Sequence, residues 1–324
     1  MKQMLSIVFD RNPLFKRQRA KDISSRFEQL NPENIHRSVG VINHGMVPES
    51  VITPTVSIIM GAYNAAETLH ECVNSILAQE FTDWELIICD DGSSDDTLRI
   101  CKKYAADHPD RFLILTNERN LKLAATLNRC LAVARGKYIA RMDADDISTP
   151  DRLTRQVAIL DSQSDVDLVG TAMQRFDETG MHSLVVPPER PDRNTLRRSV
   201  PFCHATVLAR RAVFEQTGGY SEASRAERVE DVDLWFRFYS QGFVGINLSE
   251  PLYLVREDAD AFRRRTVRAR LNGFKTTIIG YRQLGYPAHC YLHPVRQLSK
   301  ALVPTTVQRW YRHWQESPSR IVTR

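Results

Sequence analysis

The segment GKYIARMDADD, residues 136–146, contains a short apolar run that ends at three carboxylates. We expect the run, residues 138–142, to be a buried strand. Four similar runs lie at residues 56–60, 84–89, 112–115 and 166–169, and helical patterns separate the runs at residues 69–77, 95–104, 121–134 and 150–160. Strands that alternate with helices predict βαβ units, and therefore an α/β fold with a mostly parallel sheet and helices on both faces.

In such a sheet the ligand binds beyond the carboxyl ends of the strands. Three polar segments directly follow expected strands, at residues 61–64, 90–94 and 143–146. The sequence therefore predicts that these segments meet at one edge of the sheet and form one site.

Asp143, Asp145 and Asp146 place three carboxylates within four positions. Carboxylates this close repel one another unless a cation or hydrogen-bond donors compensate them. A hard divalent ion with oxygen ligands, Mg²⁺ or Mn²⁺, is the natural partner, and it needs only one or two protein carboxylates when it bridges substrate phosphates. An acidic loop before the helix expected at Pro150 explains the same residues equally well.

Three other features have both a functional and a structural interpretation. Asp91 could bind a base or a ribose, although turn chemistry explains the segment around it. Tyr63 could stack on a nucleobase or simply pack. Glu230 and Asp231 could supply a general base, but acidic residues also stabilise the start of a helix through its dipole.

The chain has 324 residues, of which 42% are apolar and 26% charged, as in a globular protein with a sizeable core. No apolar run approaches the roughly 18–20 residues of a membrane span, and the one near Met4 is too short for a signal peptide, so we expect a cytoplasmic protein. Six scattered cysteines without a CxxC pair favour buried thiols over a disulfide framework or a zinc site.

The two ends of the chain differ from its middle. Residues 1–54 lack a long periodic pattern and predict an extension and linker. Residues 256–324 look helical and carry 14 Lys and Arg against 4 Asp and Glu, a net charge of +10 that leaves −5 for the rest. This basic tail predicts an anionic partner, with a solvated surface as the alternative. Its Trp310, Tyr311 and Trp314 suit peripheral binding to the inner face of the cell membrane, while nucleic acid is the less favoured partner.

Seven segments, taken together and in this order, resemble family 2 glycosyltransferases of the GT-A fold. They are VSIIMGAYN (56–64), CDDGSSD (89–95), GKYIARMDADD (136–146), PDRL (150–153), HATV (204–207), GGY (218–220) and EDVDLW (230–235). The resemblance covers about residues 55–255. It implies a nucleotide-sugar half at 55–170 and an acceptor half at 171–255.

The resemblance implies that residues of the first half bind the sugar donor. Tyr63 would stack on the base, commonly uracil, Asp91 would bind that base, and Asp143 would hold the ribose or the sugar. Gly61 and Asn64 belong to the same donor-binding segment as Tyr63. The donor implied is a nucleotide diphosphate sugar, most often linked to UDP.

On the metal and acceptor side, the resemblance implies that Asp145 ligates Mn²⁺ or Mg²⁺ on the diphosphate. Asp231 would deprotonate the acceptor hydroxyl, and His204, Glu230 and Trp235 would lie near the acceptor. The reaction implied is a single in-line displacement that inverts the anomeric carbon. The acceptor would be a saccharide or a lipid-linked saccharide in surface polysaccharide synthesis.

One departure from the family pattern is visible. The family usually has Asn-x-Gly before the third helix, whereas this chain has Asn120, Leu121 and Lys122. Lys122 loses the conformational freedom of glycine but offers a cation that could reach the phosphates. No membrane segment follows the catalytic region, so we expect the addition of single sugars rather than processive synthesis.

Two other function classes compete with this interpretation. A nucleotidyltransferase that makes the sugar nucleotide would usually carry a basic, glycine-rich phosphate loop after the first strand, and residues 61–64 lack one. A non-catalytic protein could instead use the basic tail to bind an anion or a membrane.

Overall fold

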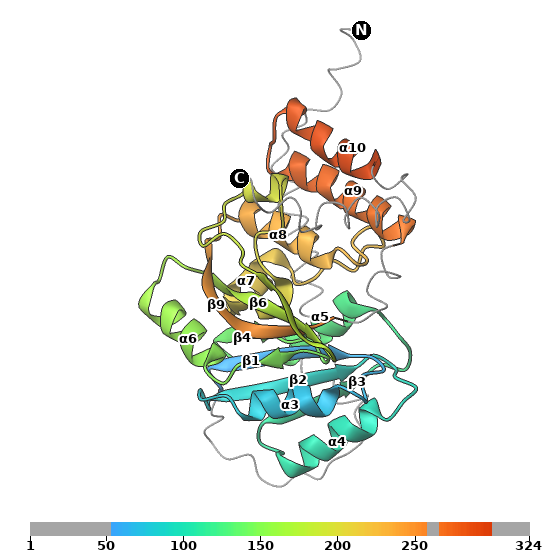
Figure 1. Cartoon of the computed structure of the whole chain (residues 1–324), viewed down its shortest axis with the longest axis vertical. Coiled ribbons are helices and arrows are strands. Elements are labelled where there is room, and N and C mark those ends of the chain that lie inside the picture. Colours follow the sequence, from blue (N-terminus) through green and yellow to red (C-terminus); the bar gives the residue numbers. More distant parts are fainter. Residues whose placement is uncertain (1–52, 258–265, 300–324) are drawn as a thin grey trace, which may run out of the picture. The chain divides into compact units, whose positions relative to one another are not determined.

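The computed structural model describes residues 53–257 and 266–299 (Figure 1). Nearly all of the predicted extension, residues 1–54, lies outside this part, and so do Trp310, Tyr311 and Trp314. The expectations for the extension and for these aromatic residues of the tail therefore stay predictions.

The first four strands form a parallel sheet in the order β3 (Phe112–Thr116), β2 (Trp84–Asp90), β1 (Val56–Ala62) and β4 (Tyr138–Arg141). β1 pairs with β2 and β4, and β2 pairs with β3, all in parallel register. Ala62 at the end of β1 stands opposite Asp90 at the end of β2. The carboxyl ends of these strands therefore share one edge, as the sequence predicts.

Beyond β4 the sheet becomes mixed. It continues through β8 (Leu208–Arg210), β6 (Leu168–Asp177), β9 (Gly245–Arg256) and β5 (Ile147–Ser148), and β7 (Gly180–Val185) pairs with β6. β8 runs antiparallel to both β4 and β6, whereas β6 and β9 are parallel. The parallel arrangement predicted from the alternation of strands and helices thus belongs to the N-terminal half.

Helices cover both faces of the sheet. α3 (Leu69–Leu77), α4 (Thr97–Asp107) and α6 (Arg152–Ser162) pack on one face, and α5 (Leu123–Val133), α7 (Arg211–Thr217) and α8 (Glu230–Ser240) pack on the other. Neighbouring side chains of β1 alternate between the two cores: Ile58 and Met60 face the first, and Ile59 faces the second. Two short 3₁₀ helices, η1 (Thr195–Arg197) and η2 (His204–Thr206), lie in the irregular half.

The helices that follow β9 belong to the second core. α9 (Val267–Gln283) packs on α8, and η4 (Ala288–Tyr291) leads into α10 (Leu292–Ser299). Gly280 of α9 lies directly against the ring of Phe236, which leaves no room for a Cβ atom. Tyr281 and Cys290 are buried in the same core. The start of the region predicted as a basic tail therefore packs into the body of the protein.

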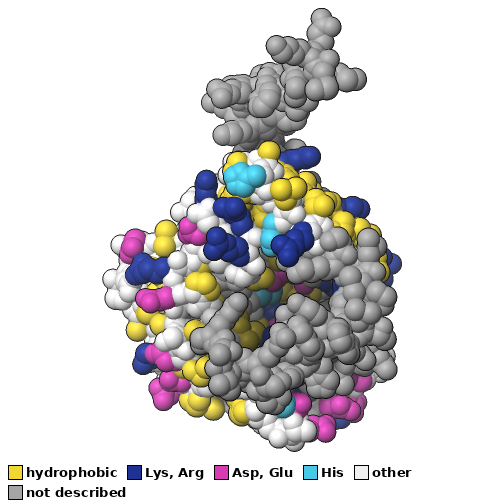
Figure 2. All heavy atoms as spheres, turned by 45° about the horizontal axis from the view of Figure 1, so that its top comes forward, with side chains coloured by type: hydrophobic (Ala, Val, Ile, Leu, Met, Phe, Trp, Pro, Cys, Tyr) yellow, Lys and Arg dark blue, Asp and Glu magenta, His cyan; other side chains and the backbone are white. Residues whose placement is uncertain are grey.

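The outer surface of α9 and α10 is basic and partly apolar. Figure 2 shows Lys and Arg side chains among hydrophobic ones over the end of the molecule that carries these helices. Val267 is 66% exposed and Leu292 is 72% exposed. Across residues 53–257 and 266–299, no helix combines the length and the apolar character that a membrane crossing requires. All six cysteines are free thiols, of which five are buried and Cys203 is half-buried.

Candidate functional site

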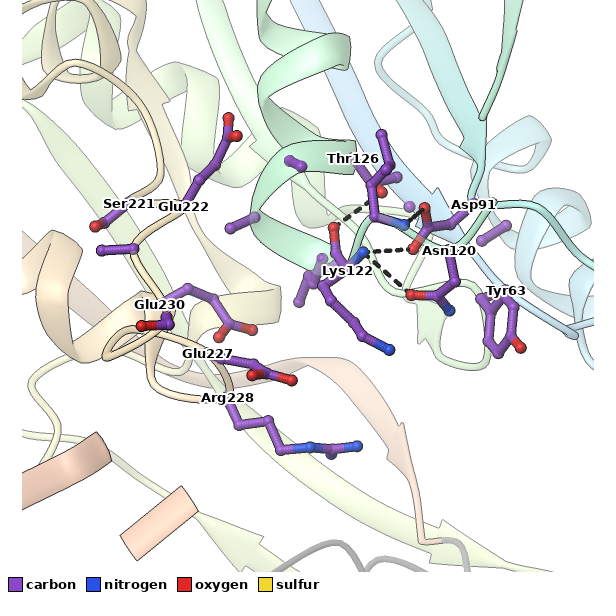
Figure 3. Close-up of a pocket in the computed structure, with 18 residues that line it drawn as sticks. Tyr63, Asp91, Asn120, Lys122, Thr126, Ser221, Glu222, Glu227, Arg228 and Glu230 are labelled. Carbon is purple, nitrogen blue, oxygen red and sulfur yellow. Dashed lines mark hydrogen bonds between the residues drawn. The ribbon is translucent and has the colours of Figure 1, made fainter. Parts of the chain in front are cut away.

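The carboxyl edge of the sheet borders a cavity of about 460 Å³ (Figure 3). One wall comes from the end of β1, the loop before α5 and the first turn of that helix, and the other comes from the loop before α8. The lining residues are Gly61, Ala62, Tyr63, Asp91, residues 120–126, residues 221–224, Glu227, Arg228 and Glu230. The cavity is large enough for a small-molecule ligand, and it joins the two halves that the sequence assigns to donor and acceptor.

Asp91 fixes the shape of the first wall. Its side chain is buried, with 4% of its surface exposed. One carboxylate oxygen accepts hydrogen bonds from the Asn117 amide and the Leu121 N–H, both at 2.7 Å, and the other accepts from the Lys122 N–H at 3.0 Å. These bonds hold the loop that takes the place of Asn-x-Gly, with Lys122 at φ 77°. Asp91 thus anchors the loop besides lining the cavity.

The other residues predicted at the end of β1 have different surroundings. Tyr63 lines the cavity and is 51% exposed. Gly61 lets α5 approach, because an added Cβ would lie 3.1 Å from the Thr126 methyl group. Asn64 is absent from the cavity lining, and its side-chain oxygen accepts a hydrogen bond from the Ser94 N–H at 2.9 Å. Asn64 therefore connects the loops that follow β1 and β2.

Asp143 follows β4 and is tied to a buried arginine. Its carboxylate pairs with Arg141, whose side chain is 1% exposed, while Asp143 itself is 34% exposed. The Asp143 N–H donates to the Tyr253 hydroxyl at 3.0 Å, and its carbonyl accepts from the Cys72 thiol at 3.1 Å. Asp143 thus offers a partly exposed carboxylate in a fixed position.

The next two carboxylates differ in exposure. Asp146 is 3% exposed, and it accepts a hydrogen bond from the Arg256 N–H at 2.9 Å. Burial, and then the charges of Asp143 and Asp145, raise the pKa of Asp146 to about 8. Asp145 is half-buried, and its carbonyl accepts from the Arg256 side chain at 3.0 Å.

This donor set fits the divalent ion that the sequence predicts. Within the described ranges, no group of three or more His, Cys, Asp or Glu side chains converges in the way an all-protein metal site requires. Mg²⁺ and Mn²⁺ accept carboxylate oxygens and need only one or two of them when phosphates and water supply the rest. Asp143 and Asp145 offer such oxygens, and their charges, after burial, contribute to the raised pKa of Asp146.

Glu230 and Asp231, which the sequence predicts on the acceptor side, open α8. Glu230 lines the cavity, and Asp231, the next residue, is half-buried. Burial raises the pKa of both carboxyls, and the charge of Arg141 opposes the rise. His204 is half-buried, and burial lowers its pKa to about 3, so its ring is neutral near pH 7.

His204 and Trp235 belong to an aromatic cluster. The His204 Nε2 lies 2.9 Å from the Tyr220 hydroxyl, and the Trp235 ring packs against Phe202 and His204 at centroid distances of 5.1 and 6.2 Å. Trp235 has no exposed surface and is absent from the cavity lining. Trp235 therefore packs within the aromatic cluster and holds His204 in place.

Electrostatic coupling joins the donor and acceptor residues. Burial raises the pKa of Tyr220, and the charges of Glu230, Asp143 and Asp231 raise it further. The charge of Arg141 lowers the pKa of Tyr220, Glu230 and Asp231 and so opposes these rises. Asp143 is the ion-pair partner of Arg141. The end of β4 at Arg141 and the start of α8 at Glu230, which are 89 residues apart in sequence, therefore share one electrostatic environment.

Comparisons with known proteins identify the family of the chain. The family model for Glycosyl transferase family 2 matches residues 57–218, half of the chain. The EpsE protein of Bacillus subtilis (strain 168) is 44% identical over 258 residues, which cover 80% of this chain and 93% of EpsE. The chain belongs to glycosyltransferase family 2.

Solved structures support the fold of this family 2 enzyme. The S. aureus TarS 1-349 structure in complex with UDP-GlcNAc has a TM-score of 0.59 at 19% identity and covers 82% of this chain and 74% of TarS 1-349. Mannosyltransferase PcManGT from Pyrobaculum calidifontis, in complex with GDP-Man and Mn²⁺, has a TM-score of 0.57 at 17% identity, with 93% and 92% coverage. The GT-A fold predicted from the sequence is confirmed.

The motifs do not assign a role to every residue of the candidate site. Arg141, which couples the two halves, lies inside the segment at residues 136–146, but its position in an apolar strand gives no sign of a function. Glu227 and Arg228 lie in an irregular loop without periodicity. Lys122 is the exception, because the missing glycine marks its position in the sequence.

Proposed function

We propose that this family 2 enzyme moves one sugar from a nucleotide diphosphate sugar, most often UDP-linked, to a hydroxyl of a saccharide or lipid-linked saccharide, with inversion, in surface polysaccharide synthesis. The cavity is the observation that carries the proposal. Tyr63 and Asp91 line its donor side, Glu230 lines its other side, and Asp231 is the next residue along α8. A donor and an acceptor can therefore meet between these walls.

Asp231 is proposed as the base of the reaction. The acceptor oxygen forms a bond to the anomeric carbon while its proton passes to the Asp231 carboxylate. The bond from that carbon to the diphosphate oxygen breaks, and its electron pair leaves with the diphosphate. Burial raises the pKa of Asp231, which makes it a stronger proton acceptor than an exposed carboxylate.

Asp145 is proposed to hold the divalent ion, with Asp143 beside it contacting the ribose or sugar of the donor. When bound, Mg²⁺ or Mn²⁺ offsets the negative charge that develops on the departing diphosphate. The coupling of Asp143 to Arg141 supports its role, because a paired carboxylate keeps a fixed orientation towards a ligand hydroxyl.

Ligand-induced thermal shifts test the donor and the metal. We expect UDP-sugars with Mn²⁺ to raise the melting temperature of the wild type, because a ligand that binds the folded state stabilises it. Asp145→Ala should lose the Mn²⁺-dependent part of the shift, and Asp107→Asn, an exposed carboxylate on α4, should keep it. A shift with GDP-mannose alone would contradict the uridine assignment, and a metal-independent shift would contradict the role of Asp145.

Inversion is tested by the anomeric configuration of the product. A donor with an α-linked sugar should give a β-linked product, which NMR of the purified product resolves. An α-linked product would contradict the single displacement and the role of Asp231 as a base.

We also propose that the C-terminal region holds the enzyme at the inner face of the membrane. Basic and apolar side chains mix on the outer surface of α9 and α10, where Val267 and Leu292 are exposed (Figure 2). Such a surface suits a bilayer that contains anionic lipids. The full chain should co-sediment with anionic vesicles, and a Val267→Asp, Leu292→Asp variant should co-sediment less. Equal sedimentation of both proteins would contradict the role of this surface.

A further inference from the structure

Three residues other than glycine have a positive φ within the described ranges: Asn64 at 49°, Lys122 at 77° and Arg228 at 65°. This region of conformational space is unfavourable for side chains with a Cβ atom, and a position that retains one often has a function. Lys122 and Arg228 both line the cavity, and Asn64 directly follows Tyr63. The unusual backbone positions therefore gather around the candidate site, and two of them carry cations.

Lys122 is held in its conformation by a network of hydrogen bonds. Its N–H donates to the carboxylate of Asp91 at 3.0 Å and to the side chain of Asn120 at 3.1 Å, and its carbonyl accepts from the Thr126 N–H at 3.1 Å. A glycine would adopt the same φ without strain. These bonds position the backbone whichever residue occupies it, so the backbone alone does not explain a lysine here.

Arg228 stands on the opposite wall, and α9 holds its loop in place. The Asn272 side chain donates to the Glu227 carbonyl at 3.2 Å, and the Thr276 hydroxyl donates to the Arg225 carbonyl at 2.9 Å. Figure 3 shows the side chains of Lys122 and Arg228 extending into the same space from the two walls. The cations thus come from the donor half and the acceptor half.

Four acidic residues, Asp91, Glu222, Glu227 and Glu230, also line the cavity. Glu227 pairs with Arg268 at 3.1 Å, and Glu222 accepts a hydrogen bond from the Asn128 side chain at 2.8 Å. Among the ion pairs of residues 53–257 and 266–299, none involves Lys122 or Arg228. The two cations are therefore available to an anionic ligand.

We propose that Lys122 and Arg228 form a two-sided clamp that binds the diphosphate of the donor. The inference rests on the proposed function for the nucleotide and sugar, whereas the clamp itself recognises only the diphosphate. Two cations on opposite walls match a group that carries charge on two adjacent phosphates. Their attraction for the diphosphate adds to that of the divalent ion.

Lys122→Gly separates this role from a structural one. Glycine removes the cation and also relieves the positive φ, so we expect the melting temperature to rise by about 2 °C. We expect the same variant to bind inorganic pyrophosphate and UDP about tenfold more weakly than the wild type, since it loses a charge-assisted contact. Arg228→Gly should weaken binding likewise, and Lys122→Arg should retain most of the affinity. Lys103→Gln removes an exposed cation from α4 and should leave both affinities unchanged.

The affinities for pyrophosphate and UDP are measured by calorimetric titration in EDTA. Because EDTA removes divalent ions, these affinities depend on the side chains and not on a metal ion. The clamp would be overturned if Lys122→Gly gained stability and bound pyrophosphate as tightly as the wild type, or if the wild type bound no pyrophosphate. Binding of GDP in place of UDP, with the same tenfold dependence on both cations, would overturn the uridine assignment of the proposed function and support the clamp. If the variants bound UDP more weakly but pyrophosphate as tightly as the wild type, the clamp would also be overturned, because the diphosphate is the group that the clamp recognises.

Discussion

Asp91→Asn tests whether Asp91 anchors the cavity wall or serves only as a contact for the base of the donor. The wild-type carboxylate accepts three hydrogen bonds, two on one oxygen from Asn117 and Leu121 and one on the other from the Lys122 N–H. An asparagine oxygen can keep the first two. Its NH₂ group would then face the Lys122 N–H, so that two donors meet in a buried position.

The expected cost follows from this geometry. A hydrogen bond to a charged group contributes about 1.5–3 kcal/mol, and a buried donor without a partner costs about 1–3 kcal/mol. Because two of the three bonds survive, we expect Asp91→Asn to lower the free energy of unfolding by about 2–3 kcal/mol. This is a large part of the roughly 5–15 kcal/mol that stabilises a typical domain.

Urea denaturation measures the stability of this variant, and calorimetry with UDP measures its donor affinity. We expect both to fall, because the loop that carries Lys122 loses its anchor. Asp107→Asn, on the exposed surface of α4, should change neither. Wild-type stability combined with lost nucleotide binding would refute the anchoring role and leave a base contact alone.

Three further predictions concern the core, the pH dependence and the base of the donor. Gly280→Ala should lower the free energy of unfolding by about 1–3 kcal/mol, because its methyl group would overlap the Phe236 ring. A methyl group at Gly273 on the same helix meets its nearest atom at 3.6 Å, so Gly273→Ala should stabilise by up to about 1 kcal/mol. Equal effects in thermal unfolding would contradict the packing of α9 on α8. In the unfolded chain His204 binds a proton below about pH 6.5, its ordinary pKa, whereas in the folded protein its pKa is about 3. The contribution of His204 to stability therefore falls as the pH drops from about 6.5 towards 3. His204→Gln should remove a loss on the order of 1–2 kcal/mol between pH 7 and pH 4, a value that allows for its partial exposure, and an unchanged pH profile of unfolding would contradict a buried neutral ring. Tyr63→Ala should weaken UDP binding about tenfold and Tyr63→Phe should not, because stacking needs the ring and not the hydroxyl; weakening by Tyr63→Phe would argue for a hydrogen bond instead.

The parallel half of the fold could be predicted because its signals are local. Apolar runs and helical spacing mark β1 to β4 and α3 to α6 to within a few residues, and glycine or polar turns separate them. The antiparallel additions depend on pairings between distant segments, which no local pattern reveals. β9 runs from Gly245 to Arg256 despite the interruption at Pro251, a length that no local pattern indicates. The exposed strand β7 and the short helix α7 gave no usable signal.

The candidate site divides in the same way. Tyr63, Asp91 and Asp143 were predicted because each follows a strand at its carboxyl end, and the structure brings all three to that edge. The opposite wall could not be predicted, because Arg228 owes its place to a loop that α9 holds through hydrogen bonds spanning 45 and 51 residues of the chain. The sequence pattern left Asp91 as either a ligand contact or part of a turn, because the hydrogen bonds that make it an anchor arise only when the chain folds.

The release of nucleoside diphosphate from a UDP-sugar in the presence of Mn²⁺ tests the central claim most directly. We predict that the wild type releases UDP as the sugar passes to an acceptor or to water. Asp231→Asn should bind the donor with unchanged affinity but release UDP at least about a hundredfold more slowly, as expected for the loss of a general base. Wild-type release by Asp231→Asn would contradict the catalytic assignment. No release from any of a panel of UDP- and GDP-sugars by the wild type would contradict the proposed function itself.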